Sequence, residues 1–226
     1  MPVEASAHRP DGDVSTASAP REHGHGNEPA AIYARSFAII DAETDWTGVP
    51  DVLRPVVRRI IHACGMTDVV HDLAWSADLA ARASAALAAG APVIGDVRMV
   101  TQGIVHGLLP AQNAVVCALD RVAVAPPGTT RAAAAIDALG PALDGAVVAV
   151  GNAPTALFRL TELARAGRVT PAAVVAMPVG FVGAAESKAA LGEDAPFAFL
   201  TLHGRRGGSA MAAAAVNALA TLAGPR

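Results

Sequence analysis

Residues 146–166, AVVAVGNAPTALFRLTELARA, decide the fold. The stretch begins with Ala146–Val150, an apolar run without alternation, as expected of a strand that is buried on both faces of a parallel sheet. A glycine-containing loop follows, and Pro154 then stands where a helix begins, because proline is favoured in the first helical turn. The stretch therefore predicts a strand, a tight loop and a helix, which together form one βα unit.

Similar units recur on both sides of this stretch. Four further short apolar runs predict strands: Pro92–Gly95, Ala114–Leu119, Ala173–Met177 and Phe197–Leu202. The predicted helices that alternate with the strands are Arg98–Gly103, Thr130–Leu139, Pro154–Ala166, Gly183–Leu191 and Ser209–Leu222. This alternation, with right-handed crossovers, predicts a three-layer α/β/α sandwich with a flavodoxin-like, doubly wound, mainly parallel sheet of about five strands.

The chain ahead of these units divides into two parts. Residues 1–28 are rich in Ser, Pro, Gly, Asp and His and contain almost no large apolar side chain, so we expect a disordered tail. Beyond it, capping and stop residues predict three helices, at Ala31–Ala42, Asp51–Cys64 and Ser76–Ala89, with Ser76 as the N-cap of the third. Residues 29–226 are therefore expected to form a single α/β domain.

Composition excludes several classes of protein. Of the 226 residues, 53% are hydrophobic and 16% are charged, and the net charge of −3 gives no electrostatic basis for binding nucleic acid or a membrane surface. The apolar runs Ala172–Ala185 and Ala210–Ala223 fall short of the roughly 20 residues that a membrane span needs. Cys64 and Cys117 match no disulfide or zinc pattern, which favours a reducing, cytoplasmic location.

The loops at the carboxyl ends of the strands are where doubly wound sheets bind ligands. Free backbone N–H groups at the helix start after Gly151 offer an anion site, although Asn152 alternatively only caps that helix. In two other loops, Arg131 and the adjacent pair Arg205 and Arg206 together suggest a ligand with several negative charges, although a solvated turn is the alternative for Gly204–Ser209. The binding residues expected in these three loops are Thr130, Arg131, Asn152, Thr155, Arg205 and Ser209.

His62 is the main candidate for proton transfer. It lies late in the predicted helix Asp51–Cys64, and an imidazole donates or accepts a proton near neutral pH. A single histidine in a helix is more often a packed or surface residue, so the residues alone leave both roles open. His71, His106 and His203 show no metal-ligand spacing, and no nucleotide fingerprint is present, so we expect neither a metal nor a cofactor.

Five strings of the sequence resemble the precorrin-8X methylmutase family of cobalamin biosynthesis. They are Tyr33-Ala34-Arg35-Ser36-Phe37, Ile61-His62-Ala63-Cys64-Gly65, Gly151–Leu157, Pro178–Lys188 and Gly204–Ser209. The likeness runs in order from about Ile32 to Asn217, and Pro178–Lys188 is its most specific part. The chain departs from the family pattern at Val105 and His106, where relatives commonly carry Thr or Asn followed by a basic residue.

The resemblance implies a homodimeric isomerase with a flavodoxin-like fold and active sites at the subunit interface. It places the family's catalytic histidine at His62, the substrate-contacting serine at Ser36 and an arginine contact at Arg131. The substrate is then a corrinoid tetrapyrrole, an apolar macrocycle edged by carboxylates. Its further contacts are expected from Arg35, Thr130, Asn152, Thr155, Lys188, Arg205 and Ser209.

The implied reaction moves a methyl group between adjacent ring carbons of precorrin-8X, or of its cobalt-containing equivalent, to give hydrogenobyrinic acid or its cobalt form. We expect His62 to protonate or hydrogen-bond a ring nitrogen so that the methyl shift is allowed without an external methyl donor. A non-catalytic corrinoid carrier is the alternative from another class, and an aromatic content of 4% disfavours a third reading, an FMN binder. Metal-free and cobalt-containing substrates both fit the sequence.

Overall fold

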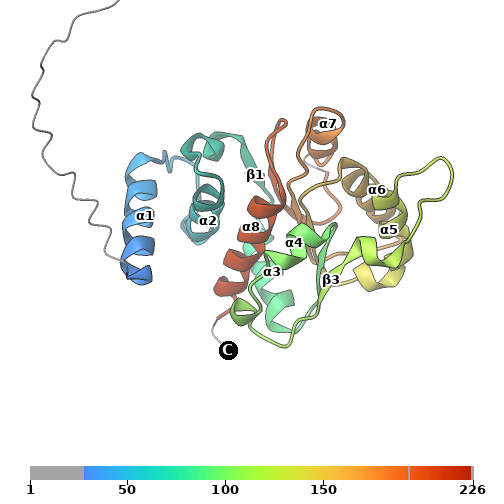
Figure 1. Ribbon diagram of the computed structural model, residues 1–226, viewed down its shortest axis with the longest axis horizontal. Coiled ribbons are helices and arrows are strands. Elements are labelled where there is room, and N and C mark those ends of the chain that lie inside the picture. The colour runs from blue at the N-terminus through green and yellow to red at the C-terminus, as the bar shows by residue number, and fades with distance from the viewer. Residues whose placement is uncertain (1–27, 193, 225–226) are drawn as a thin grey trace, which may run out of the picture.

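The computed structural model describes residues 28–192 and 194–224, and its centre is a six-stranded sheet (Figure 1). The strands are β1 Leu73–Trp75, β2 Val93–Gly95, β3 Val115–Cys117, β4 Val147–Val150, β5 Ala173–Ala176 and β6 Ala198–Leu202. They follow the order β1-β6-β5-β4-β2-β3, and β2 to β6 are parallel. The predicted mainly parallel α/β sheet is thus confirmed. The predicted tail, residues 1–28, lies outside the described residues except for Glu28.

Strand β1 corrects the predicted number of strands. Leu73–Trp75 pairs antiparallel with Leu200–Leu202 of β6, so the sheet has six strands and not five. The segment is three residues long and contains no β-branched residue, and no strand pattern marks it in the sequence. Its pairing with the edge of β6 determines its conformation.

Helices cover both faces of the sheet because side chains alternate along the strands. In β4, Val147 and Ala149 belong to one buried cluster, whereas Val148 and Val150 belong to another. The first cluster includes residues from α1 Pro29–Glu43, α2 Arg54–Cys64, α3 Leu79–Ala88, α4 Arg98–Gln102 and α8 Ser209–Leu222. The second includes residues from α5 Arg131–Leu139 and α6 Pro154–Arg165, and α6 contacts α7 Ala184–Ala189.

Short 3-10 helices join several of these elements. They are η1 Asp51–Leu53, η2 Thr67–Asp72, η3 His106–Leu108, η4 Ala118–Arg121 and η5 Gly140–Leu143. The predicted helix Asp51–Cys64 is therefore a 3-10 turn followed by α2, whose first turn contains Pro55.

Helix α3 begins at Leu79, three residues later than predicted. Ser76 does not cap it, because the Ser76 Oγ accepts a hydrogen bond of 3.0 Å from the backbone N–H of Phe199 in β6. Ser76 thus ties the end of β1 to its neighbouring strand. The sequence signal for an N-cap was real, but a strand more than 100 residues away uses the hydroxyl.

Helix α8 packs against α2 and the centre of the sheet through small buried residues. Gly103 lies close to it, since a Cβ at that position would come within 2.6 Å of the Cβ of Ala213. Although α8 is largely apolar, none of the helices in the described part of the chain is long and apolar enough to cross a membrane.

Candidate active site

Helix α2 places His62 on the surface, in the last turn of the helix. Its apolar side, which includes Val57, Ile60 and Ile61, is buried against α8 and the core. Gly65 ends the helix in the left-handed conformation, with a φ of 70° that glycine adopts without strain. Because His62 lies outside the buried stripe of this amphipathic helix, its imidazole is exposed.

Ser36 of α1 is the hydrogen-bond partner of this imidazole. The distance from the Ser36 Oγ to the His62 Nδ1 is 2.9 Å. When the hydroxyl donates to Nδ1, the ring carries its proton on Nε2. Within the described residues Nε2 has no hydrogen-bond partner, so it is available to a ligand. The structure therefore brings together His62, which the resemblance identifies as the catalytic histidine, and Ser36, which it identifies as the serine that contacts the substrate.

Two aromatic rings of α1 enclose the imidazole further. The ring centroids of Tyr33 and Phe37 lie 5.4 and 5.5 Å from that of His62. The Arg59 guanidinium lies over both rings, 5.5 Å from the centroid of Tyr33 and 5.0 Å from that of Phe37. Such contacts restrict the orientation of the imidazole. Sequence reasoning gave these three residues no role, although i,i+4 and i,i+3 spacing on two adjacent helices was a usable signal.

A small cavity of about 200 Å³ opens beside His62. Ser36 and Ile40 of α1, Ile61 of α2 and Gly65 contribute to its lining. Ligand sites for small molecules usually measure about 300–1,000 Å³. A large macrocycle would therefore extend well beyond this cavity, onto surfaces that the α1–α2 pair alone does not provide.

The anion site predicted at the start of α6 is occupied by the protein's own carboxylate. Asp96, which follows β2, accepts backbone hydrogen bonds from Gly151 at 3.0 Å, Asn152 at 2.9 Å and Ala153 at 2.8 Å. Burial raises the pKa of this carboxyl, and the N–H donors oppose that effect. The expectation that these three backbone donors are free for a ligand is therefore wrong. The alternative, that Asn152 caps the helix, is wrong as well, because the N-cap residue is Ala153 and no side chain makes a capping hydrogen bond; Asn152 is exposed.

The loop before α5 is held by the residues that were expected to bind substrate. The Thr130 Oγ1 accepts from the backbone N–H of Ala133 and lies 2.7 Å from the Thr155 Oγ1. Arg131 donates from Nε to the carbonyl oxygen of Val122 at 2.6 Å and from Nη2 to that of Leu119 at 3.0 Å. Two of the three guanidinium nitrogens of Arg131 thus organise the chain between β3 and α5, and only its remaining edge faces outward.

The adjacent arginines after β6 differ in their surroundings. Arg206 pairs with Asp68 and Asp72 of η2, which ties this loop to the segment that follows α2. These carboxylates raise the pKa of the Arg206 guanidinium. Arg205 is exposed and lies 5.3 Å from the ring centroid of Phe181, a ring that is itself largely exposed. Arg205 is therefore the one of the pair that a ligand can reach.

Three expected contacts remain, Arg35, Ser209 and Lys188, together with the position where the chain departs from the family pattern. Arg35 is exposed on α1, one residue from Ser36, whereas Ser209 opens α8 and is buried. At the position of the departure from the family pattern, the Val105 N–H donates to the Asn217 Oδ1 at 2.9 Å, so a backbone contact fixes this loop. Lys188 is buried on α7, which packs with α6 across the sheet from α2.

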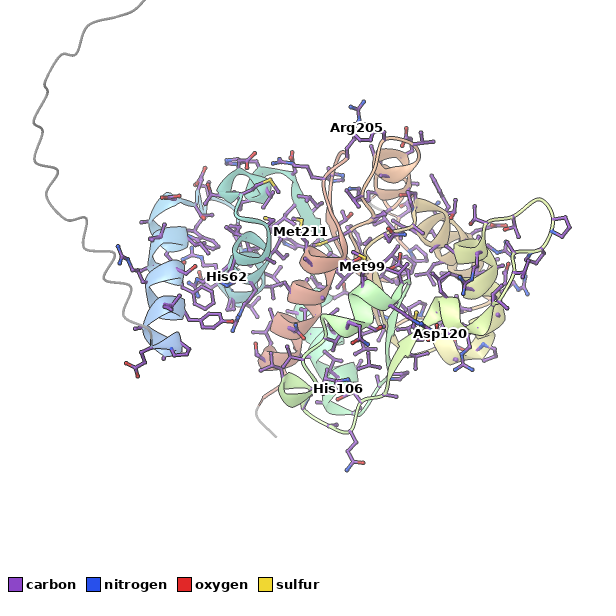
Figure 2. The ribbon with its side chains drawn as sticks, in the orientation of Figure 1. His62, Met99, His106, Asp120, Arg205 and Met211 are labelled. Carbon is purple, nitrogen blue, oxygen red and sulfur yellow. The ribbon has the colours of Figure 1, made fainter. Side chains whose placement is uncertain are left out.

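The structure does not gather all the expected site residues in one place. Arg35, Ser36 and His62 share the α1–α2 surface, whereas Arg205 lies well away from His62 (Figure 2). Thr130 and Thr155 touch each other on the α5–α6 side. In the residues that the structure describes, no group of three or more His, Cys, Asp or Glu side chains is arranged to hold a metal ion.

Fold and site together define the class of protein. It is an α/β protein with a surface imidazole that is oriented by a hydroxyl and two aromatic rings, and it carries exposed arginines at Arg35 and Arg205. This arrangement can exchange a proton with a large acidic ligand that is only partly enclosed.

Comparison with known proteins identifies the family. The family model for precorrin-8X methylmutase matches residues 31–222. A precorrin-8X methylmutase from Pseudomonas aeruginosa is 51% identical, over 84% of this chain and 94% of the relative. A cobalt-precorrin-8 methylmutase from Synechocystis is 35% identical, over 85% of this chain and 95% of the relative. The crystal structure of a precorrin-8X methylmutase from Thermus thermophilus superimposes with a TM-score of 0.77 at 38% identity, covering 86% of this chain and 96% of that one.

The chain belongs to the precorrin-8X methylmutase family. It is accordingly an isomerase of cobalamin biosynthesis. The resemblance of the five sequence strings to this family is confirmed.

Proposed function

We propose that His62 is the acid–base group of an intramolecular methyl shift on precorrin-8X. The observation that carries this proposal is the Ser36–His62 pair, in which a hydroxyl 2.9 Å from Nδ1 leaves Nε2 for the substrate. With the imidazole protonated and its Nδ1–H donated to the Ser36 Oγ, Nε2 would give its proton to a ring nitrogen while the methyl group moves between adjacent ring carbons; a neutral imidazole would donate only a hydrogen bond from Nε2. The proton returns to the imidazole when the product forms, so no co-reactant is consumed.

The substrate is bound through its carboxylate arms and its apolar faces. Arg35 and Arg205 carry exposed guanidinium groups that can bind carboxylates in a bidentate manner. Arg131 contributes its free edge, and Thr130, Asn152, Thr155 and Ser209 are further expected contacts near the strand ends. The exposed side chains of Phe181 and Val182 provide apolar cover for the macrocycle.

A second copy of the chain completes the site. His62 and Arg205 are separated in one chain (Figure 2), and the cavity beside His62 is too small for a tetrapyrrole. Ile32, Tyr33 and Ile39 are exposed apolar side chains of α1; Tyr33 packs against His62, and Ile39 lines the cavity beside it. In a homodimer these side chains would be covered, and the strand-end loops of the partner would face His62.

We further infer that the fold is a flavodoxin-like three-layer sandwich and that the enzyme works in the cytoplasm. Counted along the chain, the five parallel strands have the order 2-1-3-4-5, and helices cover both faces of the sheet, which supports the flavodoxin-like three-layer sandwich. The two free thiols, Cys64 and Cys117, support a reducing compartment, the cytoplasm.

The substrate form is the metal-free one. The 51% identical relative is named for precorrin-8X, whereas the relative named for the cobalt form is 35% identical. Turnover of metal-free and cobalt-loaded substrates in parallel assays tests this choice, and we expect faster conversion of the metal-free form. Faster conversion of the cobalt form would contradict it.

The decisive experiment replaces His62 by alanine and measures turnover and corrinoid binding separately. We expect turnover to fall by about 10²–10⁴-fold, the range of general acid–base catalysis, while binding is retained. His71→Ala is the matched control. Like His62, His71 is an exposed histidine, but it lies on η2, the 3-10 helix that follows α2. Undiminished turnover would remove His62 from the role. A wild-type protein that only shifts the corrinoid spectrum stoichiometrically would instead be a carrier.

A further inference from the structure

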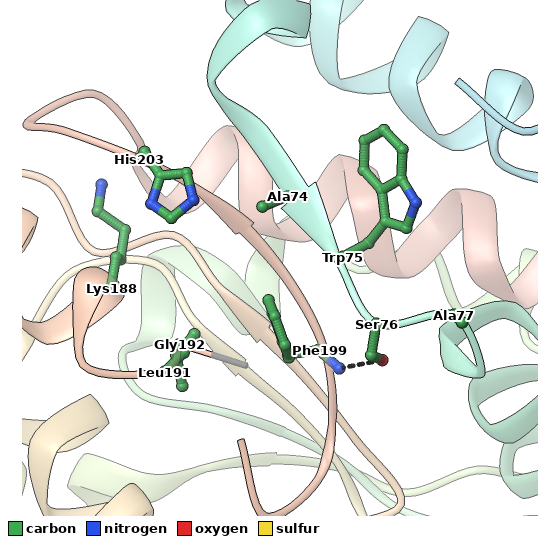
Figure 3. A pocket seen from close by; sticks show the side chains of 9 residues that line it. All are labelled: Ala74, Trp75, Ser76, Ala77, Lys188, Leu191, Gly192, Phe199 and His203. Atoms are coloured by element: carbon green, nitrogen blue, oxygen red, sulfur yellow. Dashed lines mark hydrogen bonds between the residues drawn. The ribbon is translucent and has the colours of Figure 1, made fainter. Parts of the chain in front are cut away.

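A cavity larger than the one beside His62 offers an acidic ligand no reachable lysine or arginine. Its volume is about 510 Å³, and it is bounded by β1, β6 and the end of α7 (Figure 3). The one lysine or arginine among its described lining residues is Lys188, which is fully buried and donates from Nζ to the carbonyl oxygen of Arg206 at 2.6 Å. A further contact to an acidic ligand is therefore to be sought near His62.

Helix α2, which carries His62, contains three arginines, and one of them differs from the other two in its partners. Arg54 pairs with Asp51 at 3.2 Å, and Arg58 pairs with Asp41 at 2.7 Å. For the Arg59 guanidinium, the part of the chain that the structure describes provides aromatic rings but no hydrogen-bond acceptor. Contact with aromatic rings leaves the N–H donors of a guanidinium without an acceptor oxygen. Arg59 can therefore still bind an anion.

The Arg59 guanidinium and the His62 imidazole contact the same two rings. The guanidinium carbon lies 5.5 Å from the ring centroid of Tyr33 and 5.0 Å from that of Phe37, and the imidazole centroid lies 5.4 and 5.5 Å from them. Residues three apart on a helix are also neighbours on its surface. One ligand can therefore meet the cation and the imidazole at the same time.

The surroundings of Arg59 favour an anion. Glu43, which lines the small cavity beside His62, lies ten residues along α1 from Tyr33, or roughly 15 Å along the helix axis. At that distance salt screens the carboxylate from an exposed group. The exposed Glu28, at the start of the same helix, forms no ion pair with Arg59. Arg59 does not line the small cavity, so it lies where a ligand larger than this cavity would extend.

We propose that Arg59 binds one carboxylate arm of the corrinoid while His62 meets a nitrogen of the macrocycle. A guanidinium binds a carboxylate through two parallel hydrogen bonds, an arrangement that an amide arm does not offer. The arm that Arg59 holds must therefore be a free acid, so Arg59 makes the enzyme specific for a corrinoid that is not amidated at this position. This inference rests on the proposed function, which supplies the substrate.

Arg59→Met tests the contact, because it removes the charge and keeps an unbranched side chain that can pack on the two rings. Binding of hydrogenobyrinic acid, followed by absorption spectroscopy, should weaken by about tenfold or more. KM should rise by a similar factor while kcat stays within about threefold, because the arm is held equally in the ground state and the transition state. Arg54→Met is the matched control on the same helix and should leave both values unchanged.

A second variant and a second ligand sharpen the test. Arg59→Lys keeps the charge but loses the planar fork, and binding of hydrogenobyrinic acid should weaken by about threefold. This milder variant serves if the methionine variant does not fold. A corrinoid whose arms are all amides should bind wild-type protein and Arg59→Met equally, since it presents no carboxylate to the guanidinium.

Three results would overturn the proposal. They are unchanged affinity of the Arg59 variants for hydrogenobyrinic acid, an equal loss of affinity for the amidated corrinoid, and a fall in kcat at unchanged KM. The last result would show that Arg59 only positions His62 through the two rings. Failure of the proposed function has a different signature: full turnover in His62→Ala, or wild-type protein that does not bind hydrogenobyrinic acid.

Discussion

On the α1–α2 surface the catalytic candidate His62 keeps a ring nitrogen for a ligand, whereas at the carboxyl ends of the strands the fold itself uses most of the polar groups that were expected to bind one. His62 has one hydrogen bond, to Ser36, and keeps Nε2 available. Asp96 accepts three backbone N–H groups, and Arg131 and Arg206 each bind two partners of the protein. The difference teaches that a polar residue in a ligand-binding loop is not thereby a ligand-binding residue.

Replacing Asp96 by alanine should have the largest effect on stability. The change leaves three backbone donors without their acceptor at a buried position, and such groups cost about 1–3 kcal/mol each when unsatisfied. We expect a loss of about 3 kcal/mol or more in the free energy of unfolding, measured by urea denaturation. Asp120→Ala is the control, because Asp120 forms an exposed ion pair with Arg98 and should cost less than about 1 kcal/mol. Equal losses in the two variants would contradict the structural role of Asp96.

Buried Lys188 of α7, on the side of the sheet opposite α2, should make the stability of the protein depend on pH. Its folded-state pKa of about 8 lies below the ordinary value of 10.5, so the unfolded chain binds more protons between these pH values. Stability should therefore rise from pH 8 to pH 10.5, by up to about 3 kcal/mol from this group. The rise should be absent in Lys188→Met, as measured by denaturant titration at several pH values. A parallel pH profile in both proteins would contradict the buried, uncompensated charge.

The two adjacent arginines allow a matched test. Arg206→Met removes both ion pairs to η2 and should lower the free energy of unfolding by about 1–2 kcal/mol. Arg205→Met removes an exposed cation and should leave stability within about 0.5 kcal/mol while it raises KM for the corrinoid. The opposite pattern, with stability lost in the second variant and KM raised in the first, would reverse the assignment.

Ser36→Ala should have the smallest effect of the four. The variant loses one hydrogen bond to the His62 ring, which is worth about 0.5–1.5 kcal/mol, so kcat should fall by about tenfold or less. We expect KM and the thermal unfolding midpoint to change little, since both residues are near the surface. Kinetics with wild-type protein alongside would decide this. A raised KM with unchanged kcat would make Ser36 a binding residue and not one that orients His62.

The parallel strands were predictable because their signal is local. Five apolar runs without alternation, each followed by a loop and a helical pattern, need no knowledge of distant residues. Strand β1 has no such pattern and exists because β6 pairs with it. For the same reason the true role of Ser76 could not be read from its neighbours, since its partner is Phe199.

The candidate site was predictable to a smaller extent. The likeness of two strings pointed to Ser36 and His62, and the structure places them in contact. The role of Asp96 depends on donors about 55 residues further along the chain, which no motif encodes. Arg131 lies in the expected loop, but its two carbonyl partners depend on the path of the chain between β3 and α5, which no local pattern encodes.

The carboxylate of Asp96 at the start of α6 also affects which molecules the protein ignores. In many sheets of this type that position holds the phosphate of a nucleotide, because a helix N-terminus attracts anions. Here an arriving phosphate would meet a like charge, and the amides of Gly151, Asn152 and Ala153 are already taken by Asp96. The enzyme can therefore work among abundant phosphorylated metabolites without being occupied by them at this position.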